Sequence, residues 1–255
     1  MPTLKEEKEL YRGAVKITFY PNSHQYKMDG ENLISVSRAL GVIDKPALAQ
    51  WRVDKGCDLL LAKLATEGEV TEEDIELARR EHARFSEEAA NLGTLVHEWC
   101  EKFIRSKLFG EAQPELPEDE KVLNGVLAFL KWNKENDVEY LWSERLVYSK
   151  EHGYVGTADL GIQIKGEYYL GDFKTSKSIF PEAYLQTAAY LHALQEEEGF
   201  GQYKGRYIIR LGKEDGEFEA VLVPSDYAED VQTFLSALNI AKWKKNLERS
   251  SKSAL

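Results

Sequence analysis

The chain has 255 residues, 43% of them hydrophobic and 30% charged, and a formal net charge of −11. This length provides for one substantial core, or for a core with an added helical lobe, and no apolar run approaches the roughly 20 residues of a membrane-spanning helix. The two cysteines, Cys57 and Cys100, are too few for a disulfide framework or for the four thiolates of an iron–sulfur cluster. Because residues 1–10 contain no apolar signal core, we expect a cytoplasmic protein without a membrane partner.

The net negative charge argues against a nucleic-acid partner, because phosphate contacts need lysine and arginine. The distribution of the charge weakens this objection. Of the 44 acidic residues, 17 fall in residues 67–88, 111–120 and 196–198, which are typical of solvated helix faces and loops. Residues 240–255 are basic instead, so local patches decide which partner the surface suits.

The first half of the chain predicts short hairpins followed by helices. Loose alternation and turn residues over residues 15–34 indicate one or two hairpins. Helical periodicity predicts helices over residues 35–40, 46–64, 71–108 and 119–135. Thr71, followed by Asp74, resembles a capping box, and we expect a break in the long helix near residues 91–93.

The second half predicts a sheet. Apolar alternation indicates strands over residues 140–148, 155–164, 168–174, 206–211 and 218–223. Residues 181–197 read as a helix between the third and fourth strands, and a last helix ends near residue 247. The order predicts an α/β fold in two parts, a hairpin and helical lobe at 1–90 and a core at 91–255 that ends in a helix.

The most informative pattern lies on two consecutive strands. Asp159 is on the first strand, and Asp172 lies thirteen residues later on the second, two residues before Lys174. A turn at residues 165–167 folds the strands together, so the aspartates come to lie on adjacent strands, and Asp172 and Lys174 share a face. Two carboxylates and one amine suit a divalent cation beside a reacting phosphate.

Two helices beside this hairpin carry further polar residues. His97 lies on the helix that precedes the sheet, where a histidine satisfied by a backbone carbonyl is the simpler interpretation. Gln186 and Tyr190 are four residues apart and therefore share one face of the helix after Lys174. A tyrosine packed on the sheet beside an exposed glutamine explains that pair equally well.

Together these motifs resemble a known superfamily. In chain order they are Gly-Thr-x-x-His at 93–97, Gly-x-x-Asp at 156–159, Asp-x-Lys-Thr-Ser at 172–176 and Gln-x-x-x-Tyr at 186–190. The set resembles the PD-(D/E)XK nucleases in their RecB-like exonuclease branch, with a closer likeness to bacteriophage nucleases and the mitochondrial genome maintenance exonuclease. Those proteins also tend to carry segments similar to residues 26–40 and 47–51. The resemblance implies a restriction-endonuclease-like mixed β-sheet core flanked by helices.

The resemblance also implies a metal site. Asp159 and Asp172 would bind Mg²⁺ or Mn²⁺ together with the backbone carbonyl of Phe173, and His97 would complete the coordination. Ala158 stands where the superfamily name has proline, a position that varies within the branch. Glutamate is frequent at the position of Asp172, and the aspartate keeps its charge but shortens its reach.

The remaining residues of the motifs receive supporting roles. Lys174 would orient or activate the attacking water and offset charge on the scissile phosphate, while Gln186 and Tyr190 would hold Lys174 or the DNA backbone. Glu101, one helical turn after His97, and Glu144, on the first strand, are further candidates for the metal or its surroundings. A solvated glutamate explains Glu101 equally well.

Contacts with DNA are predicted at four side chains outside these motifs. Ser35, Ser37 and Arg38 at a helix start suit a phosphate, although capping alone also explains the serines. Arg84 lies on an acidic helix, where a salt-bridged face is the default interpretation.

The function that the resemblance implies is a metal-dependent DNA exonuclease acting on single-stranded ends, in DNA repair, recombination or phage DNA processing. A flap or other structure-specific endonuclease using the same site is the first alternative, and an inactive DNA-binding module is the second. We expect a bacterial cell or a phage-infected host as its setting, and a single-strand-binding or recombination protein as a partner.

Overall fold

The computed structural model describes residues 5–199, 201–224 and 226–253. Among these, residues 5–42 and 96–253 form one compact unit, and Ile43–Leu95 form a second. This division differs from the predicted boundary at residue 90, because residues 5–42 pack with the core. In the part of the chain that the structure describes, no helix is both long and apolar enough to cross a membrane.

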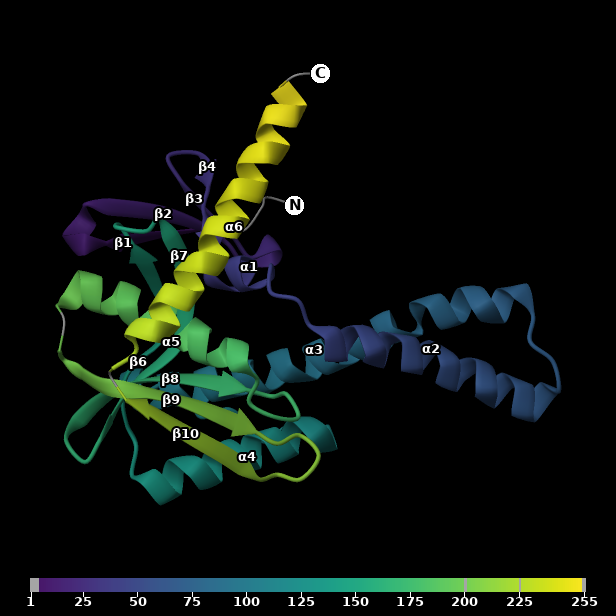
Figure 1. Ribbon diagram of the computed structural model, residues 1–255. Helices are drawn as coiled ribbons and strands as arrows, with labels where there is room; N and C mark the ends of the chain where they lie inside the picture. Colours follow the sequence, from purple (N-terminus) through teal and green to yellow (C-terminus); the bar gives the residue numbers. More distant parts are fainter. Residues whose placement is uncertain (1–4, 200, 225, 254–255) are drawn as a thin grey trace. The chain divides into compact units, whose positions relative to one another are not determined.

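The larger unit is built on a six-stranded mixed sheet (Figure 1). Its strand order is β10-β9-β8-β7-β5, and β6 also pairs with β7. The strands are β5 (Ile34–Ser35), β6 (Glu139–Ser149), β7 (Tyr154–Ile164), β8 (Glu167–Lys174), β9 (Tyr203–Leu211) and β10 (Phe218–Pro224). The β5–β7 and β8–β9 pairs are parallel and the others antiparallel. The predicted α/β class with a mixed sheet is therefore confirmed.

The N-terminal strands form a separate antiparallel sheet that packs on the first. They are β1 (Glu6–Leu10), β2 (Val15–Tyr20), β3 (Gln25–Met28) and β4 (Glu31–Asn32). One cluster of buried side chains joins this sheet to β6 and β7, namely Leu10, Val15, Ile17, Tyr26, Leu146, Tyr148 and Val155. The chain then continues into β5, where Ile34 pairs with Tyr154 of β7. This shared core explains why residues 5–42 belong to the larger unit.

Helices hold the central strands through aromatic contacts. The larger unit contains α1 (Val36–Leu40), the end of α3 (Glu72–Phe109), α4 (Glu120–Asn136), α5 (Pro181–Glu198) and α6 (Ala228–Ser253). The ring of Phe129 on α4 lies 5.5 Å from that of Phe173 on β8, edge to face. Tyr154 on β7 donates a hydrogen bond to the carbonyl of Ala189 on α5 and packs against Phe234 of α6. Edge-to-face aromatic pairs add about 0.5–1.5 kcal/mol to the burial of their area.

The smaller unit consists of α2 (Pro46–Glu67) and the first part of α3. The predicted capping box is present, since Thr71 Oγ1 accepts from the backbone N–H of Asp74 while Asp74 Oδ2 accepts from the N–H of Thr71. The two helices approach closely at Gly56, where an added Cβ would lie 3.0 Å from the carbonyl oxygen of Ala78. The absence of a side chain at Gly56 permits this approach.

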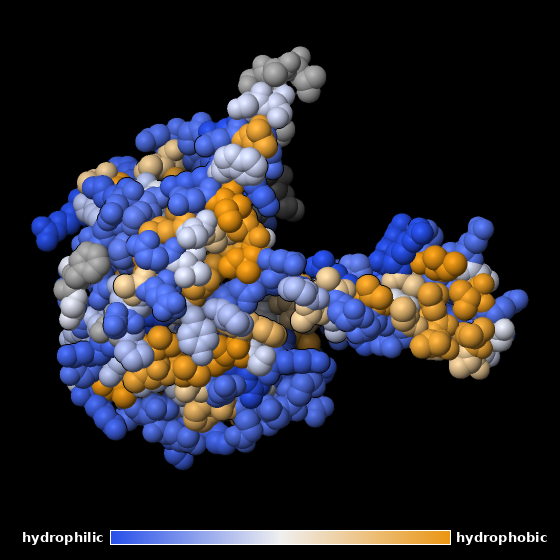
Figure 2. All heavy atoms as spheres, in the orientation of Figure 1, coloured by the Kyte–Doolittle hydropathy of each residue, from blue (hydrophilic) through white to orange (hydrophobic). Residues whose placement is uncertain are grey.

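The expected break near residues 91–93 is wrong, because α3 continues through them as one helix. A glycine inside a helix costs only about 1 kcal/mol relative to alanine, so the helix-forming residues on both sides of Gly93 keep it within the helix. The smaller unit leaves many apolar side chains on its surface (Figure 2). They include Val53, Leu61, Leu64, Ile75 and Leu77.

Candidate active site

The hairpin of β7 and β8 brings the two aspartates together, as predicted. Lys165 and Gly166 form its turn with φ values of 52° and 82°, the left-handed backbone of a tight two-residue hairpin turn. The register pairs Leu160 with Gly171. Asp159 and Asp172 are therefore the next residues on their strands beyond the last pair, where the ladder ends.

Each aspartate has a different set of partners. Asp159 Oδ2 accepts a hydrogen bond of 2.7 Å from the backbone N–H of Phe173 and lies 3.6 Å from His97 Nδ1 on α3. Asp172 is completely buried and forms an ion pair with Lys174, so these two side chains converge as predicted. Apart from this ion pair, neither carboxylate oxygen of Asp172 has a hydrogen-bond partner among the described residues. A buried carboxylate with so few partners is costly and needs an explanation.

Burial and charge shift the pKa values in this cluster. Burial raises the pKa of Asp172 to about 6, against the opposing effect of the Lys174 ammonium. Burial also raises the pKa of Asp159. The surrounding protein, and next the charge of Lys174, lower the pKa of His97 to about 4. At pH 7 the imidazole is therefore neutral and retains a lone pair for a metal ion.

Glu144 and Glu101 also lie at this cluster. The β6–β7 register pairs Ser143 with Leu160 and Arg145 with Ala158, which places Glu144 opposite Asp159. Glu144 has a φ of 47°, a conformation that costs a residue other than glycine on the order of 1–3 kcal/mol. Its side chain is exposed, yet the nearby protein atoms, followed by the charges of Asp159 and Glu101, raise its pKa well above the ordinary value. The roles of Glu144 and Glu101 stay predictions.

Gln186 and Tyr190 on α5 contact each other. Gln186 Nε2 donates a 2.9 Å hydrogen bond to the Tyr190 hydroxyl. The Tyr190 ring fills the space that a side chain at Gly156 would need, since an added Cβ would lie 2.4 Å from its Cε1 atom. Burial and then the charge of Asp172 raise the pKa of Tyr190, which keeps the hydroxyl protonated. The predicted contact of this pair with Lys174 or DNA stays a prediction.

The predicted DNA-contact residues lie elsewhere. The hydroxyl of Ser35 accepts from the backbone N–H of Arg38 and lies 3.3 Å from the hydroxyl of Ser37, so capping accounts for Ser35. The Arg38 side chain is exposed. Arg84 belongs to the smaller unit, where it pairs with Glu81 and lies over a neighbouring aromatic ring. A phosphate contact at any of them stays a prediction.

Two residues near the site received no role from the sequence. The hydroxyls of Tyr26 on β3 and Thr157 on β7 are 3.0 Å apart. Thr157 is two residues before Asp159 and shares its strand face, which is the signal that was available. Tyr26 lies on another sheet, and no local pattern predicts that contact.

The residues present fit a divalent cation. Asp159 and Asp172 supply oxygen ligands of the kind that Mg²⁺ prefers, and the neutral imidazole of His97 suits Mn²⁺ better. The buried oxygens of Asp172 that lack hydrogen-bond partners are what an ion between the two strands would satisfy.

The chain matches no known family model and no curated protein. Among solved structures it is similar to LHK-Exo, an alkaline exonuclease from Laribacter hongkongensis, at 12% identity and a TM-score of 0.37, over 66% of this chain and 93% of that one. LHK-Exo in complex with dAMP gives 11% identity and a TM-score of 0.35, over 88% and 95%. The protein SSO0001 gives 16% and 0.30, over 58% and 72%. At these values none of the three assigns a family, an activity or a ligand to the chain.

Proposed function

We propose that the chain is a divalent-metal-dependent DNA nuclease that works as an exonuclease on single-stranded ends. One observation carries this proposal. Asp159 and Asp172 lie side by side where two strands part, Lys174 pairs with Asp172, and the buried oxygens of Asp172 have no hydrogen-bond partner among the described residues. Adjacent carboxylates with one amine form a site for a cation and a phosphate.

The carboxylates of Asp159 and Asp172, the imidazole of His97 and the carbonyl of Phe173 would hold Mg²⁺ or Mn²⁺. When bound, such an ion lowers the pKa of a coordinated water and polarises the phosphoryl oxygen. The backbone N–H of Phe173 fixes Asp159 through its hydrogen bond, while the Phe173 ring packs against α4. The core therefore orients one carboxylate of the site.

Lys174 would act on the phosphate directly. Hydrolysis breaks the bond between phosphorus and the leaving sugar oxygen, adds hydroxide from water to phosphorus, and delivers a proton to the leaving oxygen. The Nζ atom of Lys174 would donate hydrogen bonds to a phosphate oxygen and offset the charge that develops there. Gln186 and Tyr190 would hold the DNA backbone beside it.

A flap or other structure-specific endonuclease would use the same residues, so cleavage of labelled DNA decides between the two modes. DNA repair, recombination or phage DNA processing is the proposed setting, with a single-strand-binding or recombination protein as a partner. Polarity and strand preference follow from the test.

The test uses single- and double-stranded DNA labelled at the 5′ or the 3′ end, with Mg²⁺, Mn²⁺ or EDTA. We expect metal-dependent release of nucleotides from ends and no cutting of circular single-stranded DNA, whereas an endonuclease would open the circle. Lys174→Ala should lower the rate by at least about 100-fold while metal and DNA binding persist, and the exposed Lys177→Ala is the matched control. The proposal fails if no substrate is cut with either metal, or if Lys174→Ala cleaves like the wild type.

A further inference from the structure

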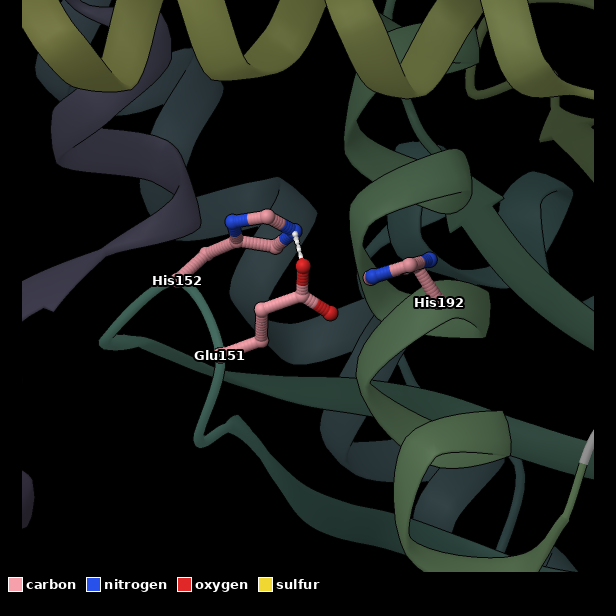
Figure 3. Close-up of side chains that lie close together, drawn as sticks. All are labelled: Glu151, His152 and His192. Atoms are coloured by element: carbon pink, nitrogen blue, oxygen red, sulfur yellow. Dashed lines mark ion pairs between the residues drawn. The ribbon is translucent and has the colours of Figure 1, made fainter.

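A second group of potential metal ligands lies where the turn between β6 and β7 meets α5 (Figure 3). Glu151 and His152 come from the turn, and His192 comes from the helix. One ligand atom from each lies within 4.8 Å of the others. Glu151 Oε1 is 3.8 Å from His152 Nε2, and the two imidazole centroids are 5.4 Å apart. None of these residues takes part in the proposed nuclease chemistry.

The backbone of the turn is fixed in place. The backbone N–H of His152 donates to the Ser149 hydroxyl at 3.0 Å, and Lys242 Nζ on α6 donates to the His152 carbonyl at 2.6 Å. The imidazole of His152 is also parallel to the ring of Tyr154, at a centroid distance of 6.4 Å. His152 therefore extends from a backbone that both the turn and α6 hold.

The same face of α5 already binds this turn. Glu196 Oε1 accepts hydrogen bonds from the backbone N–H groups of Lys150 and Glu151, at 2.7 and 3.0 Å. Glu196 is one helical turn after His192, so both side chains leave α5 on the side that meets the turn. His192 and the turn residues are thus held in proximity by contacts that need no metal ion.

The separations suit a small ion after minor movement. Ligand atoms around a tetrahedral Zn²⁺ with bonds of about 2.0–2.1 Å lie roughly 3.3 Å apart. Contraction from separations of at most 4.8 Å requires shifts of about 1.5 Å or less. The Glu151 side chain, 69% exposed, has room to rotate by that amount, while His152 is 23% exposed. Burial and then the nearby His152 lower the pKa of His192, which leaves a neutral ligand at pH 7.

We propose that Glu151, His152 and His192 bind a divalent transition-metal ion, of which Zn²⁺ is the representative. Two imidazoles and one carboxylate favour Zn²⁺, Co²⁺ or Ni²⁺ over Mg²⁺, which prefers oxygen ligands. Three protein ligands leave a position for water. The ion connects the β6–β7 turn to α5, the helix that carries Gln186 and Tyr190, so its binding stabilises the placement of that helix.

The test titrates Zn²⁺ into the full chain by calorimetry, and Co²⁺ by visible absorption, which reports the coordination geometry. We expect the wild type, His82→Ala and Asp172→Asn to bind one equivalent of Zn²⁺ at this site with the same affinity. His152→Ala and His192→Ala should weaken the Zn²⁺ affinity of the site by at least about 100-fold, and Glu151→Ala should weaken it by about tenfold. Excess Mg²⁺ should not compete with Zn²⁺ for the site. Thermal melts in EDTA check that each variant folds, and Glu151 is exposed enough for its substitution to leave folding intact.

Wild-type Zn²⁺ affinity in either histidine variant would overturn the site. An unchanged affinity in Glu151→Ala would refute the three-ligand arrangement. Loss of the bound Zn²⁺ equivalent in Asp172→Asn would instead assign the ion to the carboxylate cluster of β7 and β8. A rise in Tm with Zn²⁺ that disappears in the histidine variants supports the proposal independently of any DNA cleavage.

Discussion

Replacing Asp172 by asparagine should make the metal-free protein more stable at neutral pH. The wild-type side chain is completely buried, and burial raises its pKa to about 6, although Lys174 favours the charged form. The ordinary value is 3.8. Above pH 6 the folded protein therefore keeps a charge that water would solvate better. Asparagine has nearly the same shape without that charge.

The raised pKa sets the size of the effect. A pKa of about 6 in place of 3.8 corresponds, at 1.36 kcal/mol for each unit, to roughly 3 kcal/mol of destabilisation at pH 7.5. Below pH 3.8 both states hold the proton and the cost disappears, so stability is lost as pH rises through the interval between the two values. At pH 5 the same linkage gives about half of this destabilisation.

Urea unfolding in EDTA at pH 5, 6 and 7.5 measures this difference. The free energy of unfolding of Asp172→Asn should exceed that of the wild type by an amount that grows with pH. The control Glu118→Gln, at an exposed position, should stay within about 0.5 kcal/mol of the wild type. Added Mn²⁺ should stabilise only the wild type, and it should therefore reduce the difference in free energy of unfolding between the two proteins. The reasoning is refuted if Asp172→Asn is less stable than the wild type at pH 7.5 in EDTA, or if the difference does not depend on pH.

Three further predictions concern the site formed by β7, β8 and α5. Gly156→Ala forces a Cβ against the Tyr190 ring and should destabilise the fold by about 1–3 kcal/mol in urea, and an unchanged midpoint would contradict that packing. Tyr190→Phe removes the hydroxyl that Gln186 contacts, so it should cost about 0.5–1.5 kcal/mol while slowing DNA cleavage about tenfold, and full activity would exclude a role in holding DNA. Mn²⁺ affinity, measured by calorimetry, should rise up to about tenfold per pH unit below pH 6 as Asp172 loses its proton, and should level off above pH 7. A flat profile would remove Asp172 from the ligand set.

The hairpin at the centre of the site is predictable because its signals are local. Lys165-Gly166 permits the left-handed turn, and the alternation on either side sets the strands. The spacing of Asp159 and Asp172 then follows from the register. The helix contact between Gln186 and Tyr190 follows in the same way from a separation of four residues.

The remaining features depend on contacts that no local pattern encodes. Ile34 pairs with Tyr154 across 120 positions of sequence, in a parallel ladder of two residues. Glu144 adopts a left-handed conformation that its residue type disfavours, so the surrounding strands impose it. Gly93 suggested a helix end, yet the helix formers on both sides outweigh one glycine.

The way residues 5–42 join the larger unit has a practical consequence. An expression clone that starts after them would remove a neighbour of the strand that carries Asp159, and would leave Leu146, Tyr148 and Val155 facing water. Three uncovered apolar side chains beside an unpaired strand edge favour aggregation. A fragment that begins with the aspartate hairpin and its flanking strands would therefore test solubility rather than catalysis.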